Sequence, residues 1–257
     1  MPSVDKALRV LMVLAEAGPG GMALGQIAAH LGVSKSSLHV TLAALRHRQF
    51  VTQLEPSANY YLGPAVSRLS QIYLRSYDIR AILHGALVRL VERIDEVVHI
   101  AVLDGAEVVY LDKIPSLKPI QPGTAIGARM PALTTALGRA MLSAQQMDFD
   151  AFERRFAERL VRPTPNSPRT IEEAWERIVQ ARERGFAVDL EENVVGLMAV
   201  AVAVLNGDEP VAAVSIVTLA SECGPAGPIE HVPELRAILT AELKPPLRMA
   251  SPSELPA

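Results

Sequence analysis

The chain has 257 residues, of which 49% are hydrophobic and 21% charged, and its formal net charge is −3. This length allows two domains that each bury a core, and the composition is that of a soluble globular protein rather than a disordered or fibrous one. The single cysteine, Cys223, excludes an internal disulfide and a multi-cysteine zinc site, which suits a reducing cytoplasm.

Charge is divided unevenly along the chain. Residues 1–75 contain seven Lys and Arg and three Asp and Glu, which gives a net charge of +4. The rest of the chain contains 18 Lys and Arg and 25 Asp and Glu, which gives a net charge of −7. An anionic partner is therefore expected for the first part only. The longest apolar run, residues 194–205, is too short to span a bilayer, and the N-terminus does not resemble a signal peptide. We expect no membrane association and a buried strand in that run.

The first predicted element is an amphipathic helix that ends at Gly18. Its apolar stripe consists of Val4, Ala7, Leu8, Leu11, Leu14 and Ala15. Val10 and Met12 widen this face beyond what one helical hairpin would cover. Core packing and a dimer contact both explain the additional apolar residues.

Residues 22–47 contain two short apolar stripes separated by a tight turn. The first consists of Leu24, Ile27, Ala28 and Leu31, and the second of Leu38, Leu42 and Leu45. Gly32 and Val33 interrupt the first helix, and the Ser34 hydroxyl can cap the second. This arrangement predicts a helix-turn-helix, with an ordinary helical hairpin as the alternative.

The outward face of the second helix carries the candidate DNA contacts. Advancing about 100° per residue from Leu38 places small and polar side chains on the side away from the apolar stripe. The candidates are Lys35, Ser36, Ser37, His39, Val40 and Ala43. Lys35 suits a phosphate, the two serines suit phosphates or base edges, and His39 can donate or accept a hydrogen bond. Val40 and Ala43 can contact thymine methyl groups, although Val40 is equally explained as a tolerated apolar surface residue.

A β-hairpin and a linker helix are predicted next. Residues 50–53 and 59–62 are β-prone, and the turn-forming segment between them predicts the wing of a winged helix. Its tip lacks Lys and Arg, so we expect it to contribute weakly to DNA binding. Pro64 suits the first turn of a helix that ends near Ser76.

The rest of the chain predicts an antiparallel sheet covered by helices, and hence an α+β fold. Strands are expected at 97–103, 108–114, within the loop 115–131, and at 186–190, 199–205 and 211–219. Helices are expected at 79–94, 134–143, 149–159, 171–184 and 230–243. The Ser/Pro-rich tail from Pro245 to the end is expected to be disordered.

Several motifs in this order resemble the IclR family of bacterial transcription regulators. They are SVDKAL at 3–8, LGVSKSSLH at 31–39, YYLG at 60–63, TALGRA at 135–140 and RGFAVDLEEN at 184–193. The resemblance implies a winged helix-turn-helix DNA-binding domain at 1–63, a linker helix at 64–77 and a GAF-like effector-binding domain at 78–244, followed by the tail 245–257. It further implies dimers or dimers of dimers (tetramers), double-stranded operator DNA as partner, and control by a small metabolite.

The sequence also departs from the family pattern. Val40 and Met198 stand where the family often has Arg, Leu133 where it often has His, and Ala199 where it often has Cys. The strand after Ser215 lacks the usual Gly-Pro ending. These departures predict a pocket more apolar than usual and a small organic acid with an apolar or aromatic body as the effector.

The effector pocket is expected between the sheet and helix 134–143. Its candidate polar anchors are Thr134, Thr135, Asp189 and Ser215, and its candidate apolar walls are Leu133, Leu137, Leu197, Ala199 and Val217. Amides at the start of that helix can receive a carboxylate. Backbone hydrogen bonds would equally explain the hydroxyls of Thr135 and Ser215. Asp189 would equally serve to brace residues 191–193.

The sequence thus predicts a cytoplasmic DNA-binding regulator, with a repressor favoured over an activator and no cofactor or metal. The alternative is a small hydrolase or transferase with a DNA-binding appendage. Its candidate residues would be His99, Asp112, Asp189, Glu191 and Glu192. No metal-ligand pairing, phosphate-binding glycine loop or nucleophile elbow accompanies them, and His99 is expected to be a hydrogen-bonded core residue. A third possibility, a structural DNA-bridging protein, would need no pocket.

Overall fold

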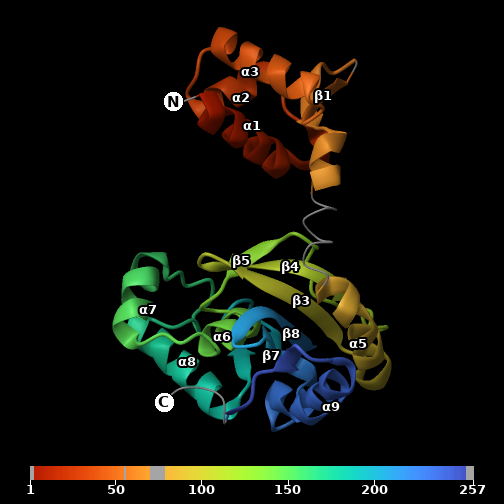
Figure 1. Ribbon diagram of the computed structural model, residues 1–257, viewed down its shortest axis with the longest axis vertical. Coiled ribbons are helices and arrows are strands. Elements are labelled where there is room, and N and C mark those ends of the chain that lie inside the picture. Colours follow the sequence, from red (N-terminus) through yellow and green to blue (C-terminus); the bar gives the residue numbers. More distant parts are fainter. Residues whose placement is uncertain (1–2, 55, 70–78, 253–257) are drawn as a thin grey trace. The chain divides into compact units, whose positions relative to one another are not determined.

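A computed structural model of the chain describes residues 3–54, 56–69 and 79–252. The chain divides into two compact units, Met1–Asp78 and Ile79–Ala257 (Figure 1). The first holds a helix-turn-helix with a hairpin, and the second holds an antiparallel sheet with helices. The predicted α+β class is confirmed.

The described part of residues 1–63 forms a bundle of short helices with a two-stranded hairpin. Its elements are α1 (Ser3–Ala17), the 3₁₀ turn η1 (Gly18–Gly20), α2 (Leu24–Leu31), α3 (Lys35–His47), β1 (Val51–Leu54) and β2 (Asn59–Leu62). Gly32 ends α2 in the left-handed conformation at φ 65°, and the Ser34 hydroxyl accepts the Ser37 N–H at 3.3 Å. These two residues make the tight turn, because glycine adopts positive φ without strain and serine satisfies an unpaired helical amide. The helix-turn-helix and the wing are therefore confirmed.

The apolar stripe predicted for α1 is buried only in part. The residues that α1 buries are Val10, Val13 and Leu14, which pack with Ile27, Leu38 and Leu42. Val4, Leu8 and Met12 instead form an exposed apolar edge, with exposed fractions of 71%, 59% and 61%. Of the predicted stripe, Leu14 is buried and Leu11 packs against the core. Apolar residues occur around most of α1, so helical spacing alone does not decide which of them are buried.

The predicted linker helix is described only in part. Residues 64–69 are helical, as Pro64 at the first turn predicts, and residues 70–77 of that prediction lie outside the described residues.

The second unit contains a seven-stranded antiparallel sheet. Along the sheet the strands run β5 (Arg129–Pro131), β4 (Glu107–Ile114), β3 (Val97–Asp104), β8 (Glu209–Leu219), β7 (Leu197–Asn206) and β6 (Ala187–Leu190), with β9 (Leu247–Met249) also paired to β7. Helices α5 (Ile79–Ile94) and α9 (Val232–Glu242) pack together on one side of the sheet. Helix α6 (Ala136–Ser143) packs on the other side and is itself covered by α8 (Ile171–Arg184), with α7 (Phe149–Phe156) against α8 (Figure 1).

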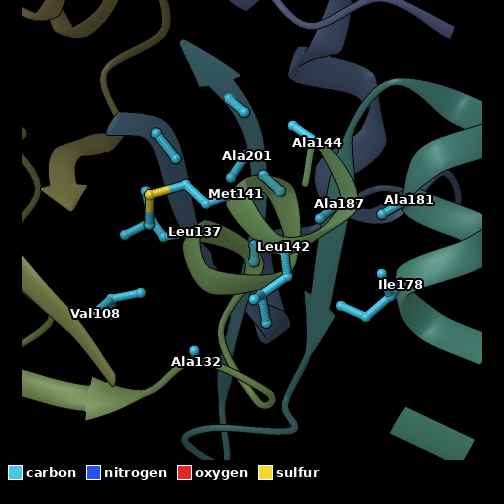
Figure 2. Close-up of a cluster of buried hydrophobic side chains, with 14 of the residues drawn as sticks. Val108, Ala132, Leu137, Met141, Leu142, Ala144, Ile178, Ala181, Ala187 and Ala201 are labelled. Atoms are coloured by element: carbon cyan, nitrogen blue, oxygen red, sulfur yellow. The ribbon is translucent and has the colours of Figure 1, made fainter. Parts of the chain in front are cut away.

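Helix α6 approaches the sheet closely because the facing residues are small. Ala199, Ala201 and Ala203 of β7 and Ala213 of β8 belong to the same buried cluster as α6. Figure 2 shows Leu137, Met141 and Leu142 of α6 between Val108 and Ala201 on the sheet side and Ile178 on the α8 side. Helix α6 is buried along its whole length, so its first turn lies inside the domain.

The prediction of a disordered tail from 245 onward is wrong for the residues that the structure describes there. Leu247–Met249 form β9, which pairs with β7 at Val204–Asn206, and the Ala250 N–H donates to the Ala203 carbonyl at 2.9 Å. Strand β6 pairs with β7 only as far as Ala201, and β7 continues to Asn206. The tail forms hydrogen bonds with the backbone groups of this last part of β7, which β6 does not reach. Residues 253–257 of the predicted tail lie outside the described residues.

Candidate functional site

The outward face of α3 presents the predicted DNA contacts to solvent. Leu38 and Leu42 are buried beneath the helix, while Lys35, Ser36, His39, Val40 and Ala43 are exposed, Val40 to 70%. Ser37 is half-buried. Polar and small side chains thus line one accessible side of a helix whose N-terminal turn also carries unpaired amides, which is the geometry for entering a major groove.

Lys6 is a contact at this surface that sequence reasoning did not single out. Its Nζ donates to the Ser37 hydroxyl at 2.7 Å, across 31 residues of sequence. Lys35, the first residue of α3, has its side chain beside Gly25 of α2. Two lysines therefore lie at the first turn of α3, where a phosphate would approach. Only the packing of α1 beside α3 reveals this, because spacing within α3 carries no information about α1.

A cavity lies between the first turn of α6 and the sheet. Seven of the nine predicted effector contacts line it: Thr135, Leu137, Asp189, Leu197, Ala199, Ser215 and Val217. It is also lined by His99, Tyr110, Pro122, Thr124, Met130, Ala136, Asn193, Val194 and Met198. The cavity volume is about 50 Å³, several times the roughly 10–15 Å³ that one water needs on the same measure. The cavity therefore suits a small molecule.

Leu133 and Thr134 do not line the cavity. The Leu133 side chain is buried, and its carbonyl accepts from Arg139 Nε at 2.8 Å. The Thr134 hydroxyl lies within 3.1 Å of Asn193 Oδ1 and 3.3 Å of the Pro131 carbonyl. Both residues hold the turn that leads into α6, and Thr135 then caps the helix by accepting the Gly138 N–H at 3.2 Å.

The loop between β4 and β5 borders the cavity through Pro122 and Thr124. Lys113 Nζ, on β4, donates to the carbonyls of these two residues at 2.6 and 3.3 Å. A single ammonium group therefore holds this part of the loop against the sheet.

Asp189 faces the cavity and braces the loop that follows β6. Its Oδ1 accepts the N–H groups of Glu192 at 2.7 Å and Asn193 at 3.3 Å. Burial raises the pKa of Asp189 to about 7, against the opposing effects of the Arg139 charge and the Asn193 amide. Bracing, which the sequence left as one alternative, is therefore present in the structure.

Glu192 in the same loop forms a buried ion pair with Arg139 of α6. The exposed fractions of these residues are 4% and 1%. Arg139 Nη1 also donates to the Val188 carbonyl at 2.8 Å, and Arg177 Nε reaches Glu192 Oε1 at 3.3 Å. Burial lowers the pKa of Arg139 to about 10, so the guanidinium remains charged at neutral pH. This pair ties α6 to the loop that supplies Asn193 and Val194 to the cavity.

The expectation that His99 is hydrogen-bonded in the core is wrong. His99 is 1% exposed, yet neither ring nitrogen has a partner among the described residues, and the same holds for the Ser215 hydroxyl. Burial, with a smaller effect of the Lys113 charge, lowers the pKa of His99 to about 3, so the ring is neutral. Tyr110 packs edge-on against it at 4.9 Å between ring centroids.

The other residues considered for an enzyme are held in structural contacts. Asp112 of β4 faces helix α5, on the side of the sheet away from the cavity. Its carboxylate accepts from His84 Nδ1 at 2.8 Å and from Arg80 Nε at 3.4 Å, both on α5. Glu191 Oε2 accepts the Gly196 N–H at 2.7 Å. Within the described ranges no three His, Cys, Asp or Glu side chains are placed to hold a metal ion. These contacts do not assemble a nucleophile with a base.

The buried carboxyl of Asp189 makes a prediction about pH. Its pKa is higher in the folded chain than in the unfolded chain, so the folded state binds more protons between about pH 4 and 7, and this group makes stability fall as pH rises through that window. Asp189→Asn should remove this effect. The unfolding free energy of the variant minus that of wild type should therefore increase by roughly 2 kcal/mol when the pH rises from 5 to 7. Urea denaturation at each pH measures this difference.

The matched control is Asp150→Asn, which changes an exposed carboxyl on α7. Its difference from wild type should stay constant over the same pH range. If the difference in unfolding free energy between Asp189→Asn and wild type also stayed constant, Asp189 would be ionised in the folded chain at every pH from 5 to 7.

Comparison with known proteins decides the family. A family model described as the bacterial transcriptional regulator IclR C-terminal matches residues 71–239, and the IclR helix-turn-helix domain matches residues 3–55. The chain belongs to the IclR family. It is similar to the HTH-type transcriptional regulator XynR of Escherichia coli K12, with 31% identity over 221 residues, covering 85% of this chain and 86% of XynR. It is also similar to the transcriptional repressor IclR of the same organism, with 27% identity, covering 91% and 82%.

Solved IclR structures share the fold. The regulator from Alicyclobacillus acidocaldarius has 27% identity and a TM-score of 0.78, covering 93% of this chain and 96% of its own. An IclR homologue from Microbacterium hydrocarbonoxydans, solved with 4-hydroxybenzoate, has 17% identity and a TM-score of 0.76, covering 93% and 100%. This IclR-family chain is therefore a transcriptional regulator with a DNA-binding domain and an effector domain, as its relatives are. None of its described helices has the length and apolar character needed to cross a membrane.

Proposed function

We propose that this IclR-family protein is a cytoplasmic repressor that binds operator DNA through α3 and whose operator affinity is controlled by a small organic acid in the cavity beneath α6. The observation that carries the proposal is the cavity itself, which opens onto the first turn of a buried helix inside the effector domain. The repressor assignment follows the similarity to the Escherichia coli repressor.

The first turn of α6 is the part of the cavity that suits a carboxylate. The N–H groups at a helix start have no intrahelical partner and carry partial positive charge, so they attract anions. Ala136 and Leu137 of this turn line the cavity, and Thr135 already satisfies the Gly138 amide. Since no Lys or Arg is among the described residues lining the cavity, these amides are the remaining site for a negative charge.

The apolar lining determines the rest of the ligand. Leu137, Leu197, Ala199 and Val217 surround the cavity with aliphatic groups. An acid with a small apolar or aromatic body fills such a space, and the 4-hydroxybenzoate of the Microbacterium homologue is an example of this chemistry in the same fold. Ligands of this kind bind where apolar walls surround a few placed polar groups.

Control requires the acid to prefer one arrangement of the assembled protein. We propose a homodimer or a dimer of dimers in which the two recognition helices meet successive major grooves. The exposed apolar edge of α1, formed by Val4, Leu8 and Met12, supplies a surface for such an assembly. A coupling free energy of roughly 1–3 kcal/mol between effector and DNA is typical of such regulators.

The DNA-binding part predicts different outcomes for two substitutions in α3. Lys35→Ala should weaken binding to all DNA sequences and reduce the slope of log affinity against log salt by about 1, because one phosphate contact is lost. His39→Ala should instead change the preference among operator variants. Fluorescence anisotropy with a footprinted operator and mutated copies, at several salt concentrations, measures both effects.

The matched control is Arg154→Ala, which removes one positive charge from an exposed position on α7. It should change neither the salt slope nor the sequence preference. Unaltered binding by both α3 variants would contradict the assignment of this helix.

The same assay tests the effector. Organic acids linked to the genes beside the operator are added to the protein–DNA complex, and one of them should shift the wild-type affinity. Ala199→Phe, which fills the cavity, should abolish that shift while leaving DNA binding in the absence of acid unchanged. A normal response by this variant would place the effector elsewhere.

A further inference from the structure

The cavity beneath α6 is lined by two buried polar side chains for which the described residues provide no hydrogen bond. His99 and Ser215 are each 1% exposed, and the described residues provide no partner for His99 Nδ1, His99 Nε2 or Ser215 Oγ. In native proteins nearly all buried polar groups are hydrogen-bonded, so two such groups side by side at a cavity are available to a partner from outside the chain. Both residues line the cavity.

The sheet fixes these two side chains next to each other. His99 on β3 and Ser215 on β8 are register partners, and directly opposite residues in an antiparallel pair project on the same side of the sheet. Ala201 of β7 is the next register partner and leaves room because its side chain is small. The Tyr110 ring packs edge-on against the imidazole at an interplanar angle of 63°, which restricts its orientation.

The pair offers hydrogen bonds without charge. Burial keeps the His99 ring neutral, so one ring nitrogen donates and the other accepts, and the Ser215 hydroxyl can do both. A carboxylate accepts only and gains no ion pair from a neutral imidazole. A ligand hydroxyl donates to the unprotonated ring nitrogen and accepts from Ser215, while a second ligand oxygen or a water satisfies the ring N–H.

We infer that His99 and Ser215 recognise a hydroxyl group, and that the effector is a hydroxylated organic acid. This inference rests on the proposed control by an organic acid and specifies its chemical class. The carboxylate lies at the first turn of α6, and the hydroxyl lies at the His99–Ser215 pair on the sheet. Discrimination between effectors then depends on His99, a residue that the sequence motifs do not mark.

The test is isothermal titration of the full-length protein with matched sets of probes. Each set contains an acid, its hydroxylated analogue and the corresponding alcohol: butanoate, 4-hydroxybutanoate and 1-butanol, and benzoate, 3- or 4-hydroxybenzoate and phenol. A site built to bond a hydroxyl rejects the analogue that lacks it, so one hydroxy acid should bind at least roughly 100-fold more tightly than its parent acid. His99→Phe and Ser215→Ala should each reduce that ratio to below about tenfold, mainly by weakening binding of the hydroxy acid.

Two variants keep this test independent of folding. Ser215→Ala removes one oxygen atom and serves if His99→Phe does not fold. The control is Thr218→Ala, which removes a second buried hydroxyl of β8. This hydroxyl also has no partner in the part of the chain that the structure describes, but it does not line the cavity. It should leave the ratio of affinities unchanged.

The outcomes separate this inference from the proposed function. Equal affinity for parent and hydroxy acids, or an unchanged ratio in both His99→Phe and Ser215→Ala, would overturn hydroxyl recognition while the organic-acid effector stands. Binding of an alcohol as tight as that of its hydroxy acid would overturn the need for a carboxylate while hydroxyl recognition stands. No binding of any probe by wild type would overturn both.

Discussion

Replacing Glu192 by alanine is expected to lower the free energy of unfolding of the effector domain by about 3–5 kcal/mol. The substitution leaves the Arg139 guanidinium, 1% exposed, as a buried charge without its carboxylate partner. Removing one partner of a buried ion pair is costly because the remaining charge has lost both water and its counter-ion. Arg139 cannot turn to solvent without abandoning the carbonyls of Leu133 and Val188, to which it also donates.

Chemical denaturation of the full chain, followed by circular dichroism, measures this effect. The control is Glu176→Ala on the adjacent helix α8, where the side chain is exposed, and its expected change is within about 0.5 kcal/mol. A second variant, Arg139→Leu, should also be destabilised, because the carbonyls of Leu133 and Val188 lose their donor and Glu192 keeps only Arg177 as a partner. A loss of less than 1 kcal/mol in Glu192→Ala would mean that the pair is hydrated in solution.

The same substitution is expected to alter the cavity. The Glu192 carbonyl accepts from the hydroxyls of Thr164 and Ser167, at 3.2 and 2.7 Å, so the loop is held from its outer side as well. These contacts keep Asn193 and Val194 at the cavity, and the Arg139 ion pair holds the loop against α6 from within. Ligand affinity should therefore fall together with stability in Glu192→Ala.

Sequence periodicity predicted the helices that have a single apolar face and bury that face in the core. The stripes of α2 and α3, the Gly32 turn and the Ser34 cap all follow from local chemistry, and the structure contains each of them. The same reasoning succeeded only in part for α1, where apolar residues occur around most of the helix and only the packing partners select Val13 for burial and leave Val4 and Leu8 exposed. It also missed β9, since pairing with β7 depends on an edge that only the assembled sheet provides.

The candidate effector residues were predictable to the extent that strand alternation places them on one side of the sheet. Alternation groups Ala199 of β7 with Ser215 and Val217 of β8, and all three line the cavity. That His99 finds no hydrogen-bond partner among the described residues was not predictable, because a histidine in an apolar strand has the same sequence pattern whether it is bonded or not. The Arg139–Glu192 pair joins residues 53 apart, a distance over which residue spacing carries no signal.

Gly138→Ala is expected to destabilise the effector domain by several kcal/mol, although alanine is normally the better helix former. A β-carbon at Gly138 would lie 2.3 Å from the Ala132 carbonyl oxygen and 2.4 Å from the Ala132 Cα, so the backbone before α6 would have to move. Overpacking a core typically costs about 1–3 kcal/mol, and displaced backbone adds to that cost. Thermal and urea unfolding of the full chain measure the loss.

The matched control is the same substitution at Gly85, in the middle of α5. A β-carbon there would find Arg89 Nη2 at 3.9 Å as its nearest neighbour, and the residue is exposed. Gly85→Ala should therefore stabilise the domain by about 0.5–1 kcal/mol, the helix propensity difference between the two residues. If Gly138→Ala destabilises the domain and Gly85→Ala stabilises it, the cost arises from the close contact between Gly138 and the turn at Ala132. Because that turn leads into the helix start that lines the cavity, Gly138→Ala should also weaken acid binding. Stabilisation by both substitutions would show that the turn yields without cost and that the close approach of Gly138 does not fix the first turn of α6.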